Sequence, residues 1–347
     1  MKVLGDILII GAGPAGIISV CVHHKKYPNK KIIWIDKEFN VGNLSSYPHV
    51  YANTSYKKMI QFINIMYELI DNTYKMETCN ELDHNYFKLG CLCNEFKKIT
   101  RIVRGFPMIT SAKDRITDIR KEQNSWHCIG GNDNYVVDKV LLATGCLHKS
   151  LSYDKPVISI KEALNPNILI KRDLESRRVL VFGNSHSGIL ILKNLYDLGC
   201  RDITCVYKHP IKLPYIRDGV EIYDQSGLRG IAKDWVGANI LPENKTHIRF
   251  IKYNDNINDI VDKCDYVIYA IGLKQAKLPT IETYTEARSQ HTMSRCYTDY
   301  SFDPETGELC EGIYGIGVGF PAHFILEDNL ECEVGIYEFL ERARQIL

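Results

Sequence analysis

The chain has 347 residues, which allows two domains at roughly 150 residues each. Hydrophobic residues make up 45% and charged residues 24%, an ordinary globular composition that excludes a disordered or fibrous protein. The 43 Lys and Arg residues nearly balance the 42 Asp and Glu residues, leaving a net charge of +1. No global attraction to nucleic acid or to an anionic membrane is therefore expected.

The sequence has no run of 18 apolar residues, so no membrane-spanning helix is predicted. Residues 1–10 are apolar but lead directly into Gly11, Gly13 and Gly16, without a charged segment and a cleavage site. This pattern predicts a strand rather than a secretory signal peptide. The 12 cysteines are scattered, and we expect them to be reduced thiols of a cytoplasmic protein rather than a disulfide framework.

A buried strand followed by a glycine-rich turn opens the first predicted unit. The turn reads Gly11-Ala12-Gly13-Pro14-Ala15-Gly16. The flanking elements are a strand over 6–10, a helix over 17–26, a strand over 31–35, and a distant closing strand over 136–143 that ends in Thr144-Gly145. Strand, glycine turn, helix and strand form the βαβ unit of a parallel sheet.

The same pattern recurs in the middle of the chain. Its turn reads Gly183-Asn184-Ser185-His186-Ser187-Gly188. Its elements are a strand over 178–182, a helix over 189–198, a strand over 202–207, and a closing strand over 265–270 followed by Ile271-Gly272. Because this copy is the shorter one, we expect it to be inserted into the first.

The expected fold class is therefore α/β, with two Rossmann-like three-layer domains, the second inserted in the first. The predicted boundaries give a first part over 1–154, an inserted domain over 155–272, and a returning part with a C-terminal helix over 273–347. The less regular stretches predict a helix over 56–74, strands over 97–104 and 124–129, and a helix over 331–347.

Each glycine of the first turn has a distinct predicted role. Gly11 permits the tight turn, Gly13 lets the backbone approach a pyrophosphate, and Gly16 allows the helix to pack closely on the strand. The exposed N–H groups at the helix start then hold the anion. The alternative is a glycine-rich turn that binds nothing.

The residues around these glycines complete the first predicted site. Pro14 and Ala15 lie in the turn itself. Asp36 comes 20 residues after Gly16, where its carboxylate is expected to accept hydrogen bonds from a ribose diol, and Lys37 follows it.

The order of the parts resembles the two-dinucleotide-binding-domain flavoproteins over nearly the whole chain. The resemblance rests on the two glycine turns, Asp36, Ala143-Thr144-Gly145 and the segment 312–317. It implies that the first fold binds FAD and the inserted fold binds NAD(P)H. It also assigns Thr144 and Gly145 to the place where the chain leaves one domain for the other, and Gly317 to a close approach to the flavin.

The second turn resembles the G-x-S-x-S-G variant of flavin monooxygenases that use NADPH. Its predicted cofactor-binding residues are Gly183, Asn184, Ser185, Ser187 and Gly188. His186 either lines the phosphate site or is a helix-start residue without a chemical role.

The strand over 202–207 is followed by Lys208 instead of an acidic residue. An acid there accepts from a free 2′-hydroxyl and repels a 2′-phosphate, whereas a base attracts that phosphate. We therefore expect NADPH rather than NADH, with Arg201 and Arg217 as reserve candidates. The alternative is that Lys208 is a solvated loop residue.

Electrons that reach a flavin can pass to a cysteine pair, as in the disulfide reductases. Those enzymes carry C-x4-C after the second strand of the FAD fold, or C-x-x-C in the inserted domain, and neither pattern occurs at these places. Cys91 and Cys93 form a C-x-C, but a disulfide between them would close a strained ring. They are either a weak redox pair or two thiols without that role.

The second acceptor is molecular oxygen. Residues 41–54 resemble the segment after the FAD ribose site of class B flavin monooxygenases, with Gly42 and Asn53-Thr54 matching. The family's second glycine is Asn43 here, and its Trp is missing. Asn53 and Thr54 are the predicted catalytic residues, because an amide stabilises a developing anion without supplying a proton. The alternative is a turn-forming Asn53.

The sequence leaves the roles of several nearby side chains undecided. Tyr47, Tyr51 and Tyr56 either stack near the flavin ring or belong to the core. The segment 315–321 lacks the Asp of disulfide reductases, as in class B monooxygenases, and His323 faces either the active site or the surface. The monooxygenase signature F-x-G-x-x-x-H does not occur between Gly145 and Arg178.

These features predict an FAD-dependent NADPH oxidoreductase, and most specifically a monooxygenase that hydroxylates nitrogen or sulfur of a small molecule with O2. The alternatives are an NAD(P)H-dependent flavin reductase or oxidase without hydroxylation, and a non-catalytic flavin-binding regulatory protein. No nucleic acid, membrane or metal is expected as a partner, and a homodimer is left open.

Overall fold

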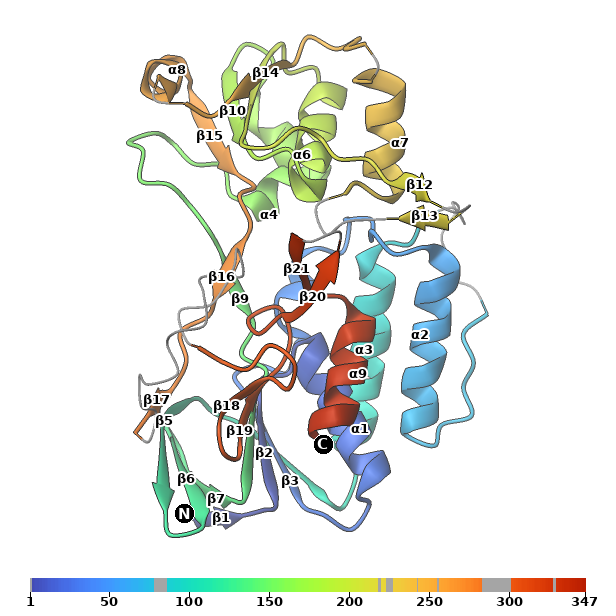
Figure 1. Cartoon of the computed structure of the whole chain (residues 1–347), viewed down its shortest axis with the longest axis vertical. Helices are drawn as coiled ribbons and strands as arrows, with labels where there is room; N and C mark the ends of the chain where they lie inside the picture. Colours follow the sequence, from blue (N-terminus) through green and yellow to red (C-terminus); the bar gives the residue numbers. More distant parts are fainter. Residues whose placement is uncertain are drawn as a thin grey trace.

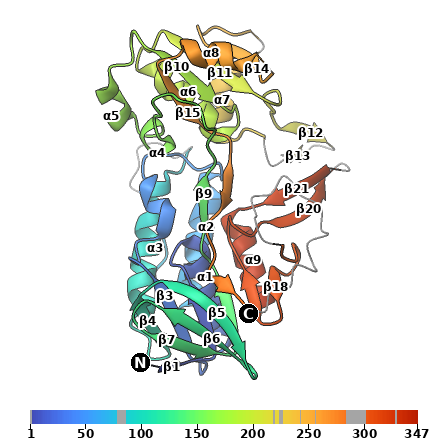
Figure 2. The same cartoon turned by 90° about the vertical axis from the view of Figure 1, so that its left-hand side faces the viewer.

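The computed structural model describes residues 2–77, 86–217, 220–222, 227–241, 243–254, 256–282, 301–326 and 329–347. Figure 1 shows two bodies stacked along the long axis, with both ends of the chain in the lower body. The upper body comes from the middle of the chain, and the strands β9 and β16 run between the bodies (Figures 1 and 2). We call the lower body the first domain and the upper body the inserted domain.

The central sheet of the first domain has the strand order β18-β19-β8-β2-β3-β4. All neighbours in it are parallel except β18 and β19. Its strands are β2 (Ile7–Ile10), β3 (Ile32–Asp36), β4 (Ile109–Lys113), β8 (Lys139–Leu142), β18 (Glu308–Cys310) and β19 (Ile313–Gly315). β2 is buried at every residue, as expected for a strand covered on both faces.

Two layers cover this sheet. Ile7, Ile9 and Trp34 pack on one face against helices, which are α1 (Pro14–Lys26), α2 (Tyr56–Leu69), α3 (Leu89–Val103) and α9 (Ile336–Ile346). Leu8 and Ile33 pack on the other face against a second sheet of order β1-β7-β6-β5-β17. Its strands are β1 (Lys2–Leu4), β5 (Ile116–Glu122), β6 (Ser125–Gly130), β7 (Asn134–Val137) and β17 (Thr280–Ile281).

The inserted domain has a parallel sheet of order β14-β11-β10-β15. Its strands are β10 (Arg178–Phe182), β11 (Asp202–Tyr207), β14 (Arg249–Lys252) and β15 (Tyr266–Tyr269). Its helices are α4 (Ile160–Ala163), α5 (Pro166–Leu169), α6 (His186–Asp197), α7 (Gly230–Asn239) and α8 (Ile257–Lys263), with the 3-10 turn η2 (Ile170–Arg172). Separate hydrophobic clusters on the α6 and α8 sides make it a three-layer unit.

The chain passes between the domains through an antiparallel ribbon of β9 (Cys146–His148) and β16 (Leu273–Gln275). The remaining elements are the 3-10 turn η1 (Gly42–Ser46) and two hairpins, β12 (Tyr215–Arg217) with β13 (Val220–Ile222) and β20 (Ala322–Leu326) with β21 (Asn329–Glu333). The α/β class and the insertion of one Rossmann-like unit in another are thus confirmed. The boundaries at 154 and 272 stay predictions.

The predicted strand over 97–104 is wrong, because residues 97–103 belong to α3 and Arg104 is the C-cap of that helix. Leu92, Phe96, Ile99 and Val103 of this helix are buried, and their spacing of four, three and four residues is helical. The stretch 97–104 alone is too short to show that period.

Three other predicted elements differ at their bounds. The single strand over 136–143 is divided, because β7 pairs with β6 of the second sheet and β8 pairs with β2 of the central one. The C-terminal helix starts only at Ile336, after Gly335, and residues up to Glu333 belong to β21. The helix predicted over 56–74 ends at Leu69.

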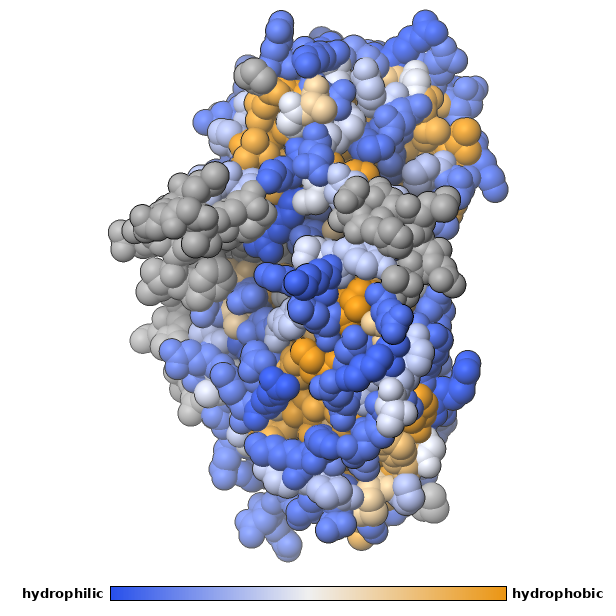
Figure 3. Space-filling model, turned by 90° about the vertical axis from the view of Figure 1, so that its right-hand side faces the viewer, coloured by the Kyte–Doolittle hydropathy of each residue, from blue (hydrophilic) through white to orange (hydrophobic). Residues whose placement is uncertain are grey.

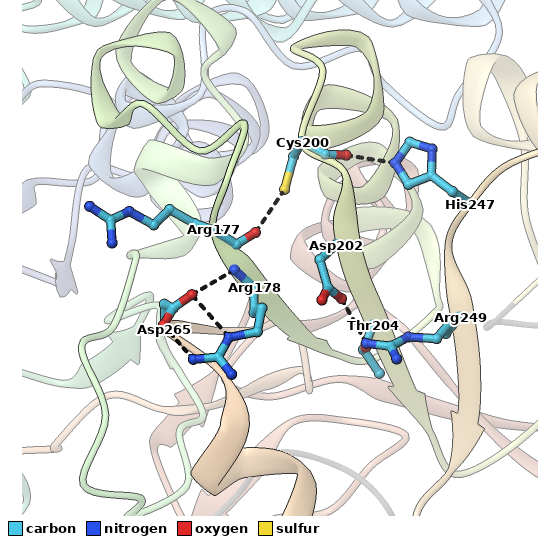
Figure 4. Close-up of polar contacts among 8 residues, drawn as sticks. All are labelled: Arg177, Arg178, Cys200, Asp202, Thr204, His247, Arg249 and Asp265. Atoms are coloured by element: carbon cyan, nitrogen blue, oxygen red, sulfur yellow. Dashed lines mark hydrogen bonds and ion pairs between the residues drawn. The ribbon is translucent and has the colours of Figure 1, made fainter.

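Charges alternate along the amino-terminal edge of the inserted sheet (Figure 4). In strand order, β14, β11, β10 and the residue before β15 contribute Arg249, Asp202, Arg178 and Asp265. Arg249 Nη2 donates to Asp202 Oδ1 at 2.6 Å, and Arg178 Nη2 donates to Asp265 Oδ1 at 2.9 Å. The Arg178 guanidinium lowers the pKa of Asp265 to about 2.

Candidate functional site: two glycine turns and the contact between domains

The first glycine turn joins β2 to α1 and is crowded at two of its glycines. Gly11 has a φ of +113°, and a Cβ there would lie 2.2 Å from the Ala143 carbonyl oxygen. A Cβ on Gly16 would lie 2.0 Å from the Gly11 carbonyl oxygen. A Cβ on Gly13 would meet no atom within 4 Å. The turn is therefore closed against the sheet at two positions and open beside Gly13, where a ligand can approach the backbone.

Asp36 lies at the carboxyl end of β3, next to this turn. Its Oδ2 accepts from the Ala12 N–H at 2.8 Å, and its Oδ1 accepts from the N–H groups of Glu38 and Phe39 at 2.8 and 2.7 Å. A carboxylate offers about four acceptor positions, so one is left for a ligand hydroxyl. Lys37, the next residue, is exposed.

Distant parts of the chain gather around the start of α1. A Cβ on Gly42 would lie 3.0 Å from Gly13 Cα, and a Cβ on Gly317 would lie 2.8 Å from Ala15 Cβ. Gly145 has a φ of +76° and open space beside it. The Thr144 Oγ1 atom is buried and has no hydrogen-bond partner among the described residues. We call the turn 11–16 with Gly42, Thr144, Gly145 and Gly317 the first cradle.

The second glycine turn repeats the crowded geometry between β10 and α6. Gly183 has a φ of +103°, and a Cβ there would lie 2.3 Å from the Ala270 carbonyl oxygen. A Cβ on Gly188 would lie 2.1 Å from the Gly183 carbonyl oxygen. Ser185 is the N-cap of α6, and its side chain makes no capping hydrogen bond, while Ser187 lies in the first turn of that helix. We call the turn 183–188 the second cradle.

The backbone next to Lys208 is bonded to the second cradle. Asn184 Nδ2 donates to the His209 carbonyl oxygen at 2.9 Å, and Lys208 Nζ lies 5.7 Å from the centroid of the Tyr253 ring. Arg201 precedes β11 at the opposite end of the strand and pairs with Glu175, so it is not brought to this turn. The side chain of Arg217 lies outside the described residues.

His186 begins α6 at a contact between the two domains. Both ring nitrogens are buried, and neither makes a well-formed hydrogen bond with the described residues. Burial lowers the pKa of His186, with a further lowering from Arg229, and the nearby Tyr51 backbone opposes the shift. The imidazole is therefore neutral where the second cradle meets the first domain.

Asn53 and Thr54 lie in the turn between Ala52 and α2. The Ala52 N–H donates to the Phe87 carbonyl oxygen at 2.8 Å, Asn53 is exposed, and Thr54 is half-buried. This turn lies beside the inserted domain, because a Cβ on Gly230 would come within 3.6 Å of the Ala52 carbonyl oxygen. The exposed amide is accessible to a ligand in this region.

The structure gives contacts for the other candidates named from the sequence. Tyr56 packs on Phe87, with ring centroids 5.9 Å apart, so it belongs to the core side of its helix. The Tyr47 hydroxyl bonds His148 Nε2 of the ribbon. The His323 ring lies 6.3 Å from the Phe302 ring, and burial lowers its pKa.

The cysteines do not form the C-x-C pair. Cys93 is a free, buried thiol, and burial raises its pKa, whereas Cys91 is disulfide-bonded. Cys91 and Cys332 therefore depart from the expectation of reduced thiols. Cys200 and Cys205 are free thiols, and their Sγ atoms bond the carbonyl oxygens of Arg177 and Gly183 respectively.

Two bonds beside the first cradle were not predicted. Asn43 Nδ2 donates to the Cys146 carbonyl oxygen at 2.9 Å, and Gln275 Nε2 donates to the Gly319 carbonyl oxygen at 3.1 Å. Both attach the ribbon to segments of the cradle. The sequence carries no signal for these two bonds, because each joins residues that are far apart in the chain.

The comparisons with known proteins agree with this architecture. The family described as pyridine nucleotide-disulphide oxidoreductase matches residues 5–279. Monooxygenase AgnR1 of Paecilomyces divaricatus is 24% identical, over 98% of this chain and 96% of its own length.

Solved structures share the fold at lower identity. A flavin monooxygenase from Stenotrophomonas maltophilia, carrying two substitutions, has a TM-score of 0.64 at 11% identity, covering 99% of this chain and 96% of its own. A bacillithiol disulfide reductase from Staphylococcus aureus has a TM-score of 0.62 at 16% identity, covering 100% and 97%. The fold thus occurs in a monooxygenase and in a disulfide reductase.

Two nested dinucleotide-binding domains, together with the family match over residues 5–279, define a flavin-dependent pyridine nucleotide oxidoreductase. The chain belongs to the pyridine nucleotide-disulphide oxidoreductase family, and FAD and a pyridine nucleotide are its cofactors. The open backbone at Gly13 and the unpartnered Thr144 Oγ1 fit a diphosphate-bearing ligand in the first cradle. Within the described part of the chain, the helices lack the length and apolar character needed to cross a bilayer.

Proposed function

We propose that the protein is an NADPH-dependent flavin monooxygenase that hydroxylates a nitrogen or sulfur atom of a small molecule, with O2 as co-substrate. The observation that carries this proposal is the second cradle, which combines a G-x-S-x-S-G turn with Lys208 at the end of the next strand. The monooxygenase relative, which aligns with nearly the whole chain, supports it. The separate hydrogen bonds of the free thiols Cys200 and Cys205 also support it.

The proposed roles of the residues follow from the two cradles. The backbone N–H groups of Gly13, Ala15 and Gly16 at the start of α1 hold the FAD diphosphate, and Asp36 accepts from the ribose of FAD. The second cradle holds the NADPH diphosphate, and Lys208 attracts the 2′-phosphate. When bound, FAD supplies the two-electron chemistry that connects NADPH to oxygen.

We assign Asn53 to the reaction itself. Its exposed amide donates a hydrogen bond to charge that develops beside the flavin ring, and the half-buried Thr54 follows it in the same turn. An amide holds such a charge without releasing a proton of its own. In an Asn53→Ala variant, NADPH is therefore expected to reduce the flavin as in the wild type. The yield of hydroxylated product per NADPH consumed is expected to fall to a small fraction of the wild-type yield.

The experiment that tests the proposal has two stages. NADPH is first mixed anaerobically with the FAD-loaded protein, and loss of the visible flavin absorption is followed, with NADH as the comparison. Oxygen and a panel of amines and thioethers are then added, and hydroxylated product and hydrogen peroxide are measured per NADPH oxidised. We expect faster reduction by NADPH and at least one substrate that yields product in place of peroxide.

A second candidate is a flavin reductase or oxidase without hydroxylation. The missing F-x-G-x-x-x-H signature and the structural similarity to a disulfide reductase favour it. Rapid reduction followed by peroxide release with every substrate tested would select this candidate. If neither nicotinamide cofactor reduces the flavin, the protein is a flavin-binding regulator.

A further inference from the structure

The two domains meet at a small contact beside the second cradle. Tyr86 of the first domain donates its hydroxyl to Asp234 Oδ2 of α7 at 2.5 Å. At the start of α7, a Cβ on Gly230 would lie 3.6 Å from the Ala52 carbonyl oxygen and 3.8 Å from Tyr86 Cδ1. The backbone of α7 therefore lies directly against Ala52 and the Tyr86 ring.

Tyr86 is held firmly on its own side of the contact. The neighbouring Phe87 carbonyl accepts from the Ala52 N–H, and Tyr51 forms an antiparallel bridge with Lys88. The Tyr51 and Tyr86 rings meet edge to face, with centroids 5.9 Å apart and an interplanar angle of 72°. The Tyr86 hydroxyl is thus presented to α7 from a segment with little freedom.

One segment of the first domain runs past both cradles. It begins at Gly42, in contact with Gly13 of the first cradle. Asn43 and Tyr47 then bond Cys146 and His148 of the ribbon. The segment ends at Tyr51, whose backbone lies beside His186 of the second cradle. The placement of α7 on this segment therefore sets how the two cradles face each other.

The contact between the domains is not packed throughout. A hollow of about 180 Å³ remains in it, bordered on one side by His49, Val50 and Tyr51 and on the other by residues of α5, α6 and α7 such as Pro166, Leu190 and Ile231. Figure 3 views the molecule from the side of α2 and α7, and its apolar residues form separate patches on the two bodies. Interfaces between domains of this incomplete kind allow relative motion.

We propose that Tyr86 and Asp234 are positioning residues that hold the inserted domain in the orientation from which NADPH reduces the flavin. The proposal rests on the assignment of the second cradle to NADPH. Without this hydrogen bond the inserted domain spends less time docked, and the observed rate of reduction falls with the docked fraction. FAD and NADPH keep their own binding sites, so their affinities stay unchanged.

The test compares Tyr86→Phe and Asp234→Ala, which remove the donor and the acceptor of the bond respectively, with the wild type as FAD-loaded proteins. The limiting rate of anaerobic flavin reduction at saturating NADPH is expected to fall about fivefold in either variant, the size expected for one ordinary hydrogen bond. The double variant is expected to fall no further, because both changes remove the same bond. FAD content and the dissociation constant of NADP⁺ are expected to match the wild type.

The matched control is Tyr337→Phe. It also removes a tyrosine hydroxyl bond, from Tyr337 to the Lys58 carbonyl oxygen at 2.7 Å, but within the first domain. This variant is expected to reduce at the wild-type rate. Hydrogen exchange of the amides at 230–235 supplies a readout independent of turnover, and it is expected to accelerate in Tyr86→Phe and not in Tyr337→Phe.

Two results would overturn the proposal. Unchanged reduction rates in Tyr86→Phe and Asp234→Ala would mean that the bond does not position the domains. Faster reduction would mean that the docked orientation is a resting state. If the assignment of the second cradle to NADPH is wrong, the result is different from both of these, because the wild-type protein would then bind no NADP⁺ at all.

Discussion

The two glycine turns of this protein have nearly the same backbone and different side chains. At Gly11 and Gly183, an added Cβ would lie 2.2 and 2.3 Å from the carbonyl oxygen of the alanine that follows the closing strand. At Gly16 and Gly188, it would lie 2.0 and 2.1 Å from the carbonyl oxygen of the first glycine. These distances show that steric closure of the turn against the sheet is common to both cradles.

The differences lie where a ligand would be recognised. The middle residue of the motif is Gly13 in the first turn and Ser185 in the second. The strand after the helix ends in the acidic Asp36 in the first domain, whereas in the inserted domain it is followed by the basic Lys208. Asp36 bonds back to its own turn through the Ala12 N–H, whereas Asn184 reaches forward to the His209 carbonyl. A shared backbone thus carries two specificities through a few side chains.

The largest expected effect comes from filling the crowded position in either turn. Gly16→Ala is expected to abolish FAD binding, because its Cβ would overlap the Gly11 carbonyl oxygen. Gly188→Ala is expected to retain FAD, and the rate at which NADPH reduces its flavin is expected to fall about tenfold or more. Flavin absorbance of the purified variants and anaerobic reduction measure the two outcomes.

Gly237→Ala is the control for these variants. Gly237 lies inside α7, and a Cβ there would meet nothing within 4 Å, so the substitution is expected to leave both cofactors bound. Loss of FAD from Gly188→Ala would contradict the separation of the two cradles.

The next effect concerns the strand ends. Lys208→Glu places a carboxylate where a 2′-phosphate is expected, and kcat/KM for NADPH is predicted to fall by about tenfold or more, while the value for NADH changes little. Steady-state kinetics with both cofactors give the ratio. An equal loss with NADPH and NADH would assign Lys208 to a general structural role.

The smallest expected effect is a pH dependence of stability that comes from α1, the helix after the first cradle, and not from α6, the helix after the second. α1 carries His23 in its last turns, and burial lowers the pKa of His23 to about 4, whereas the corresponding turns of α6 have no histidine. The unfolded chain takes up a proton near the usual pKa of 6.5, and the folded protein does so only near 4. Stability from this site is therefore present above about pH 6.5 and is lost as the pH falls toward 4.

Thermal unfolding of the wild type and His23→Gln between pH 7 and pH 4 tests this expectation. The variant is expected to unfold at a lower temperature at pH 7 and to lose less on acidification. The exposed His49→Gln is the control and is expected to follow the wild type. Parallel curves for the wild type and His23→Gln would exclude His23 as a source of acid sensitivity.

The sequence predicted the parts of the fold that depend on local physics. β10 and β11 were predicted at their observed bounds, because each is a short apolar run with clear breaks at its ends, a glycine turn after β10 and Lys208-His209-Pro210 after β11. α3 was partly mistaken for a strand, since the period of Leu92, Phe96 and Ile99 emerges only over three helical turns. The contact of Tyr86 with Asp234 joins residues 148 positions apart, and no local pattern encodes it.

The row of charges at the amino edge of the inserted sheet has a consequence for assembly. Arg249, Asp202, Arg178 and Asp265 alternate in sign along the observed order β14-β11-β10-β15. Exchanging any two adjacent strands would bring like charges side by side, and such neighbours repel. The edge thereby discriminates against mispaired sheets while the chain folds, far from the ligand-binding end of the same strands.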